Sequence, residues 1–108
     1  MNSQMLPLAS IEATRRAMEY WDAHWDFECP SLFGITHQDL KQSIALWPNP
    51  PAESSRIVAL ASVGALRELL YGASAAPKAH LPLLVGMSYD EAHELASVVY
   101  ALAQTQGE

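Results

Sequence analysis

The sequence predicts an all-α fold: a single-domain bundle of about four principal helices around a central apolar helix at about residues 55–71. The first observation is this central stretch, in which the clearly polar residues from Ile57 to Tyr71 are Ser62, Arg67 and Glu68. A helix that is apolar all round is buried, and the Arg-Glu pair interrupts the run before the ~20 residues that a membrane span needs. The second observation is that no stretch alternates as a half-buried strand does. The third is size, because 108 residues, 50% of them apolar, suffice for one core.

The first predicted helix begins at Ser10, whose side chain can cap it, and runs to about Trp25. Residues 1–9 are expected to be loose. The residues at helical spacing, which should face the core or a partner, are Ile11, Thr14, Met18, Trp21 and Trp25. Pro30 favours an extended conformation at Cys29, so we expect the helix to stop before this point. The loop that follows is expected to reach the core through Leu32 and Phe33.

The second predicted helix has a clear beginning and end. Thr36 is placed to cap it, with Asp39 as the acidic member of a capping box, and Ile35 and Leu40 suit a hydrophobic staple. Its apolar stripe consists of Leu40, Ile44 and Trp47. The following Pro-Asn-Pro-Pro, residues 48–51, is not compatible with a helix and forms a stiff linker into the central helix.

The central helix is expected to be capped by Ser54 or Ser55, and Gly72 lies where a left-handed C-terminal residue belongs. Small residues leave room for a close helix neighbour: Ala59, Ala61, Ser62, Gly64 and Ala65. The connection after it includes a short turn of helix at residues 81–85.

The last helix opens with Gly86-Met87-Ser88-x-x-Glu91, which has the spacing and chemistry of Gly34-Ile35-Thr36-x-x-Asp39. We interpret this match as the shared requirements of helix entry rather than as a duplication. The predicted buried stripe of the helix consists of Ala92, Leu95, Val99 and Leu102. Residues 104–108 are expected to fray.

Charge restricts the partners. The formal net charge is -6, and the segment between Arg16 and Lys41 contains no basic residue while holding Glu19, Asp22, Asp26, Glu28 and Asp39. Such a segment repels phosphate, which excludes direct nucleic-acid binding. It would steer a basic protein toward itself, although a net charge of roughly 2–8 is also ordinary for solubility alone.

The densest part of this segment combines carboxylates with aromatic rings. We define the acidic-aromatic surface as the predicted partner-binding residues Glu19, Asp22, Trp25, Asp26, Phe27 and Glu28. Large aromatic side chains are enriched at interface hot spots, and interleaved carboxylates suit a basic protein. The alternative interpretation is that the aromatic residues of this stretch, Trp21, Trp25 and Phe33, are simply part of the core.

No catalytic residue, metal ligand or cofactor site is predicted. His24 and its acidic neighbours face different sides of a helix, and neither HExxH nor paired CxxC is present, so a small metal-dependent enzyme built on the His24 region is the less favoured alternative. Nothing near Cys29 lowers the pKa of a thiol. This lone cysteine favours a reducing compartment, and the N-terminus lacks the pattern of a secretory signal, so we expect a cytoplasmic protein.

The sequence WDFECPSLFGITHQDLKQSIALWP, with the later ALRELLYGA, resembles small bacterial immunity proteins of contact-dependent growth inhibition toxin–immunity pairs. The resemblance covers about residues 20–90 and rests on W-D-x-E-C-P-x-L-F-G-I. It implies binding to a cognate toxin domain, often a nuclease, whose active site or substrate path is blocked. These proteins have many unrelated folds, so no fold and no residue role is carried over. The alternative is a helical adaptor or homodimeric structural module without a toxin partner; a homo-oligomer is compatible with the immunity interpretation but not required.

Overall fold

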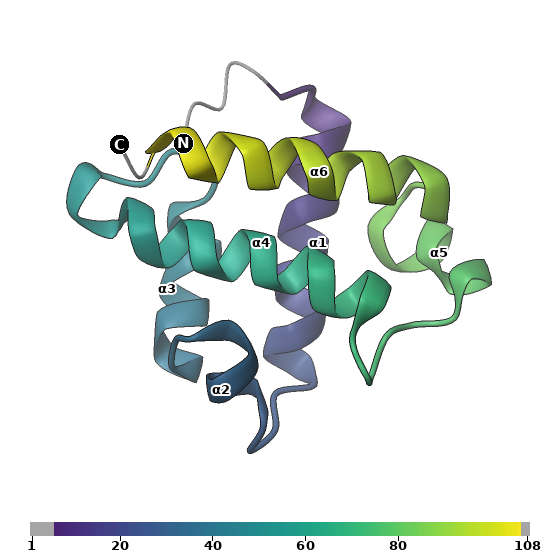
Figure 1. Ribbon diagram of the computed structural model, residues 1–108, viewed down its shortest axis with the longest axis horizontal. Helices are drawn as coiled ribbons and strands as arrows, with labels where there is room; N and C mark the ends of the chain where they lie inside the picture. The colour runs from purple at the N-terminus through teal and green to yellow at the C-terminus, as the bar shows by residue number, and fades with distance from the viewer. Residues whose placement is uncertain (1–5, 107–108) are drawn as a thin grey trace.

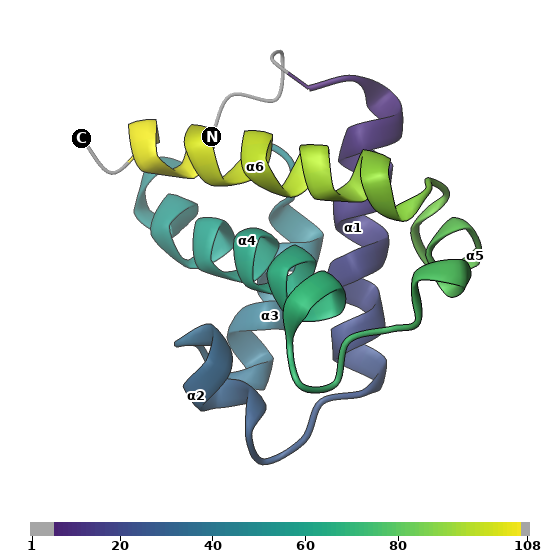
Figure 2. The same ribbon diagram turned by 45° about the vertical axis from the view of Figure 1, so that its right-hand side comes forward.

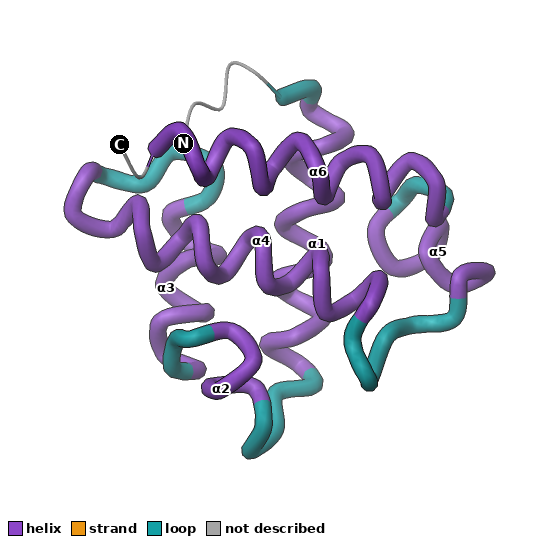
Figure 3. Tube along the Cα trace, viewed as in Figure 1, coloured by secondary structure: helices purple, strands orange, loops and turns teal. Residues whose placement is uncertain are grey.

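The computed structural model describes residues 6–106, which form six α-helices and two short 3₁₀ helices without a strand (Figure 1, Figure 3). The α-helices are α1 (Leu8–Ala23), α2 (Cys29–Phe33), α3 (His37–Leu46), α4 (Ser55–Tyr71), α5 (Leu81–Val85) and α6 (Tyr89–Gln106). The 3₁₀ helices are η2 (Ala52–Ser54) and η3 (Lys78–His80). The predicted all-α fold is therefore confirmed. The expectations for residues 1–5 and 107–108 lie outside the described residues.

Helix α4 occupies the centre of the fold. It packs against α1, α2, α3 and α6, and it runs beside α6 while both cross α1 (Figure 1, Figure 2). Its buried residues are Val58, Ala61, Ser62, Ala65, Leu66, Leu69 and Leu70. The Trp21 indole Nε1–H donates a 3.0 Å hydrogen bond to the Ala65 carbonyl, which ties α1 directly to α4. The small residues of α4 thus permit the close approach that the sequence predicted.

The N-cap of helix α1 lies three residues earlier than predicted, and the helix ends two residues earlier. Pro7, with φ -61° and ψ 156°, occupies the N-cap position, and Ser10 lies inside the first turn, so the predicted serine cap is wrong. A proline suits a helix start because its fixed φ needs no rearrangement and its missing N–H is not required there. The preceding Leu6 is 7% exposed, which holds this end of α1 against the core. Trp25 lies beyond the helix, after the C-cap residue His24.

Pro30 starts a helix instead of preventing one. The sequence predicted an extended Cys29 and a loop, but α2 begins at Cys29 with the proline in its first turn. The amide N–H groups of a first turn have no partner within the helix, so proline loses nothing there. Of the two predicted anchors, Phe33 is buried and Leu32 is 52% exposed.

The predicted capping box of α3 is confirmed. The Thr36 hydroxyl accepts a 3.0 Å hydrogen bond from the Asp39 N–H, and the Asp39 carboxylate accepts one of 3.0 Å from the Thr36 N–H. The predicted box of α6, between Ser88 and Glu91, is also present, at 3.1 and 3.3 Å. Together these boxes fix where the two helices begin.

The predicted ends of α4 are corrected. Ser54 occupies its N-cap position but its side chain makes no capping hydrogen bond, and the Ser55 hydroxyl donates instead to the Ala52 carbonyl. Gly72 is extended, with φ -72° and ψ 173°, and not left-handed. The left-handed glycines are Gly34 and Gly86, at φ 75° and 81°, which end the two short helices.

The two halves of the chain, α1–α3 and α4–α6, repeat one pattern. In both, a long helix is followed by a five-residue helix with proline at its second position, a left-handed glycine and a capping box. The sequence offset between Gly34 and Gly86 also superposes Leu8-Ala9-Ser10 on Leu60-Ala61-Ser62 and Arg15 on Arg67. At this offset the following pairs are buried in both halves: Ala13 and Ala65, Thr14 and Leu66, Ala17 and Leu69, Met18 and Leu70, Cys29 and Leu81, Phe33 and Val85, Leu40 and Ala92, Ser43 and Leu95, Trp47 and Val99.

The packing of the halves is reciprocal. Helix α1 packs against α5 of the second half, and α4 packs against α2 of the first (Figure 2). The sequence match is therefore wider than the requirements of helix entry to which the sequence analysis attributed it. The halves differ at their ends, because α3 stops at Leu46 whereas α6 continues to Gln106.

Within the described residues, no helix combines the length and the apolar character needed to cross a membrane.

Candidate functional site

The acidic-aromatic surface lies on the last turns of α1 and on the connection from α1 to α2. Phe27 is 89% exposed at this connection, between the exposed carboxylates Asp26 and Glu28. Glu19 is exposed on α1. Asp22 and Trp25 are half-buried. The structure thus brings the six predicted residues onto neighbouring segments, and it leaves the Phe27 side chain almost fully exposed.

Local hydrogen bonds hold the connection in one conformation. The Asp26 carboxylate accepts a 2.9 Å hydrogen bond from the Glu28 N–H, and the Asp26 carbonyl accepts one of 3.2 Å from the Cys29 N–H. Such an Asx turn replaces backbone pairing in a loop. Cys29 is 1% exposed and fixes the end of the connection in the core. Phe27 is therefore presented from a fixed backbone, although its own ring touches solvent on nearly every side.

Trp25 belongs partly to the core. Its indole stacks on the His37 ring at a centroid distance of 4.9 Å and an interplanar angle of 11°, and its centroid lies 5.4 Å from that of Phe33. His24 lies outside this stack and packs on Tyr20, at 4.2 Å. The alternative interpretation, that Trp21, Trp25 and Phe33 are core, is thus correct for Trp21 and Phe33, which are buried, and describes Trp25 in part.

Asp22 is engaged within the molecule. Its carboxylate lies 2.7 Å from the His37 Nε2 and 3.0 Å from the Lys41 Nζ. Burial alone would raise the pKa of Asp22, but hydrogen bonds from Lys41 and His37 outweigh it and lower the pKa below its ordinary value. Among the described residues Glu19, Asp26 and Glu28 form no ion pair, so these three carboxylates are the ones available to a partner.

The reactive groups nearest to this surface are Cys29 and the residue types that can bind a metal ion. Burial, followed by the neighbouring Asp26 and Glu28 carboxylates, raises the pKa of the Cys29 thiol, which keeps it protonated and unreactive at neutral pH. Over residues 6–106, no three His, Cys, Asp or Glu side chains gather as metal ligands would.

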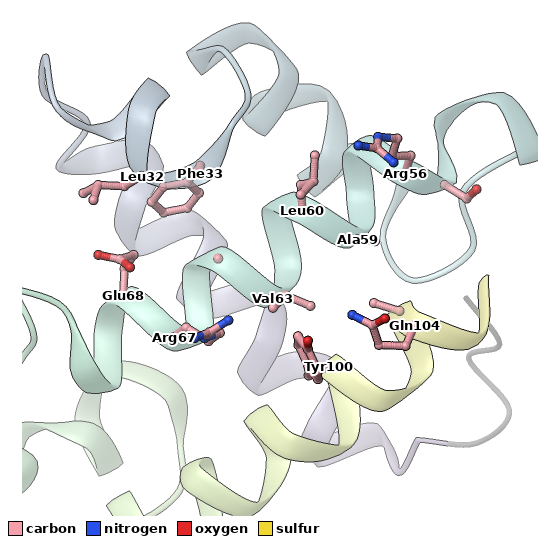
Figure 4. A pocket seen from close by; sticks show the side chains of 13 residues that line it. Leu32, Phe33, Arg56, Ala59, Leu60, Val63, Arg67, Glu68, Tyr100 and Gln104 are labelled. Carbon is pink, nitrogen blue, oxygen red and sulfur yellow. The ribbon is translucent and has the colours of Figure 1, made fainter. Parts of the chain in front are cut away.

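A second candidate site, an open groove of about 730 Å³, lies between α2, α4 and α6 (Figure 4). Leu32 and Phe33 of α2 form one side, Tyr100 and Gln104 of α6 form the other, and α4 forms the floor. The floor residues include Arg56, Ala59, Leu60, Val63, Gly64, Arg67 and Glu68. This groove was not predicted from the sequence, because the apolar pattern of a helix does not indicate which of its faces the neighbouring helices leave uncovered.

A third cluster joins the end of α4 to the start of α6. The Tyr71 hydroxyl is hydrogen bonded to Nδ1 of His93, whose ring stacks with Tyr89 at 6.3 Å. The Lys78 ammonium lies 4.5 Å from the Tyr89 ring centroid. Burial, then the proximity of Tyr89, raises the pKa of the Tyr71 hydroxyl, so it remains a neutral hydrogen-bonding group. This cluster connects two helices, and Tyr71 also lines an open hollow of about 330 Å³ together with Arg67, Ala96, Ser97 and Tyr100.

Comparison of the chain with protein-family models, with curated proteins and with solved structures finds no match in any of the three. Functional inference therefore starts from the acidic-aromatic surface and the groove.

Proposed function

We propose that this chain is a cytoplasmic immunity protein that binds and neutralises a cognate toxin domain, with a basic nuclease as the expected class of toxin. The observation that carries the proposal is the exposed Phe27 on a fixed connection between Asp26 and Glu28. The sequence resemblance around this same connection points to the same class of function.

The physical basis is an anchor surrounded by charge. An exposed phenylalanine that becomes buried in a partner contributes about 2–3 kcal/mol from its apolar area. Because the backbone of the connection is already held by Asp26, little conformational entropy is lost on binding. The exposed carboxylates of Glu19, Asp26 and Glu28 form no ion pair within the described residues, and they attract a cationic surface over a distance of about one Debye length, which accelerates encounter.

The test is co-expression with the open reading frame encoded immediately upstream, scoring growth and co-purification. The expected result is that the C-terminal domain of this neighbour kills cells and that the chain rescues them in a stable complex. Phe27→Ala should then raise the dissociation rate about tenfold or more, as expected for loss of a central aromatic anchor. Leu83→Ala is the matched control, since Leu83 is 86% exposed on α5, away from the connection.

Charge is tested separately from the anchor. The double variant Glu19→Lys, Glu28→Lys, which leaves the Asp26 side chain of the turn in place, should slow association by about tenfold at low salt, and the difference should shrink as salt is added. Glu94→Lys, a reversal at an exposed position of α6, should leave the association rate near that of the wild type. A harmless neighbour, or equal behaviour of the surface variants and their controls, would refute the proposal. Sedimentation of the isolated chain then tests the homodimeric alternative.

A further inference from the structure

The groove floor is a regular stripe of α4. Arg56, Leu60, Val63 and Arg67 follow one another at i, i+4, i+7 and i+11, which places them on one helix face. Two arginines therefore bracket an apolar centre. At 1.5 Å per residue, their Cα atoms are about 16 Å apart along the axis, or three turns.

The repeat of the fold shows what an arginine at this position binds. Arg15 of α1 corresponds to Arg67 of α4, and its guanidinium donates to the carbonyls of Ile44 and Trp47, at 3.1 Å each. These carbonyls lie at the C-terminal end of α3, where no helical N–H is left to pair with them. In the first half, the arginine thus binds the end of a neighbouring helix.

The second half has the arginine but lacks that helix end. The positions that correspond to Ile44 and Trp47 are Ala96 and Val99, which lie inside α6 because this helix continues to residue 106. Their carbonyls accept hydrogen bonds from the helix itself. The guanidinium of Arg67 instead lies 5.8 Å from the ring centroid of Tyr100. Tyr100 belongs to the additional C-terminal turns by which α6 is longer than α3.

Within residues 6–106, neither Arg56 nor Arg67 forms an ion pair, although the chain carries a net charge of -6. Glu68 is the one carboxylate among the residues that line the groove. The groove is therefore a cationic site in an acidic protein, and its charge favours anionic or carbonyl acceptors from a partner.

The walls of the groove favour an apolar occupant between the two charges. Leu32 is 52%, Leu60 37% and Tyr100 45% exposed, and all three line the groove from different helices. A single small anion does not match this arrangement, because it cannot reach both guanidinium groups across three helical turns. An amphipathic helix that lies in a groove matches both the length and the chemistry.

We propose that the groove between α2, α4 and α6 is the docking site for an acidic amphipathic helix of a partner protein. Its apolar face packs on Leu60, Val63 and Leu32. Acidic side chains about three turns apart, or the carbonyls at its C-terminal end, bind Arg56 and Arg67. This inference stands apart from the toxin-binding proposal, because it concerns a different surface with the opposite charge preference.

The probe for the test is a synthetic 18-residue peptide that is helical in solution, carries leucines along one face and has glutamates near both ends of that face. It is titrated to millimolar concentration into the isotope-labelled full chain, and amide resonances are followed. Perturbations should concentrate at Leu32, at Tyr100 and along the groove face of α4. A peptide with lysines in place of the glutamates should bind at least about fivefold more weakly, because it loses the arginine contacts.

Matched variants test the role of the arginines. Arg67→Gln should weaken binding of the glutamate peptide about fivefold, and the double variant with Arg56→Gln should weaken it further. Arg16→Gln is the control, since Arg16 is an exposed arginine of α1 that pairs with Glu12. The amide spectrum of each variant verifies that it is folded.

Three outcomes would overturn the proposal: no groove perturbation at millimolar peptide, equal binding of the lysine peptide, or equal binding by Arg67→Gln. If free succinate at equal concentration perturbs the same amides, the ligand of the groove is a small anion and not a helix. No toxin takes part in this experiment, so its failure leaves the immunity proposal untouched, and failure of the co-expression test leaves the groove untouched.

Discussion

Replacement of Arg15 by methionine should destabilise the fold, whereas the same replacement at the corresponding Arg67 should not. Arg15 donates two hydrogen bonds, at 3.1 Å each, to the carbonyls that end α3. Methionine retains an apolar stem of similar length but leaves these carbonyls without a donor. Arg67 has no such carbonyl within the described residues and lies over the Tyr100 ring.

The size of the effect follows from these contacts. A hydrogen bond with a charged donor contributes about 1.5–3 kcal/mol when buried, but the Arg15 side chain is 30% exposed, and solvent screens part of this. We therefore expect Arg15→Met to lower the free energy of unfolding by about 2 kcal/mol. For 108 residues at about 2.1 cal/mol/K each, this lowers the Tm by about 9 °C.

Urea unfolding followed by tryptophan fluorescence measures the free energy, and circular dichroism measures the Tm. The Arg67→Met variant, the matched control, should remain within about 0.5 kcal/mol of the wild type, as surface substitutions usually do. The reasoning would be refuted if both variants lost the same stability, or if Arg15→Met were neutral. Either result would mean that the two arginines contribute equally to the free energy of unfolding despite their different surroundings.

Three further predictions concern the caps, the core and the pH dependence. Thr36→Ala and Ser88→Ala should each lower the free energy of unfolding by about 1 kcal/mol, since each removes one capping box. Urea unfolding measures this change, and a loss of stability in one variant alone would contradict the equivalence of the two boxes. Leu69→Ala should lower the free energy of unfolding by about 3 kcal/mol because Leu69 is fully buried. Leu83→Ala, at an exposed position, should lower it by at most about 0.5 kcal/mol. Similar thermal midpoints of the two variants would show that Leu69 is not buried. Because the folded-state pKa of Asp22 is lowered, the stability that Asp22 contributes is present above its ordinary pKa of 3.8 and is lost as pH falls through the folded-state pKa. The gap between wild type and Asp22→Asn, about 0.5–1 kcal/mol near pH 6, should therefore close on acidification, and a gap that stays constant in urea unfolding down to pH 2.5 would contradict this.

Local chemistry made much of the fold predictable. The capping box of Thr36 and Asp39 satisfies two backbone donors within four residues, so it operates without help from the rest of the chain. The five-residue helix at Leu81–Val85 was predicted with its bounds for a similar reason, because it is short and bounded by Gly86. Such features depend on neighbours in sequence, which a reader of the sequence can see.

The errors arose where two local rules compete. Pro30 both disfavours a helical residue before it and suits the first turn of a helix, and the structure follows the second rule. Gly72 and Gly86 both follow apolar helices, but the left-handed conformation occurs at Gly86 alone of this pair. Tertiary packing settles the choice at Pro30, since Cys29 and Phe33 are buried together at the two ends of α2.

The candidate sites were predictable to different degrees. The composition around Phe27 identified the acidic-aromatic surface. It could not show that the Asp22 carboxylate already pairs with Lys41 and His37 within the molecule. The groove needs three helices to be placed, so no periodicity in α4 reveals it. The correspondence between Arg15 and Arg67 follows from the repeat of the two halves, and this repeat is recognised once the buried residues of each half are known.

The reciprocal packing of α1 on α5 and of α4 on α2 has a consequence for synthesis of the chain on the ribosome. The first half emerges before α4 and α5, which cover part of α1 and α2, have been made. The core of each half is therefore completed by a helix of the other. Two nascent chains on one messenger could exchange halves across the proline-rich linker at residues 48–51 and still form every native contact. Correct folding of a single chain thus depends on the high local concentration that this short linker imposes.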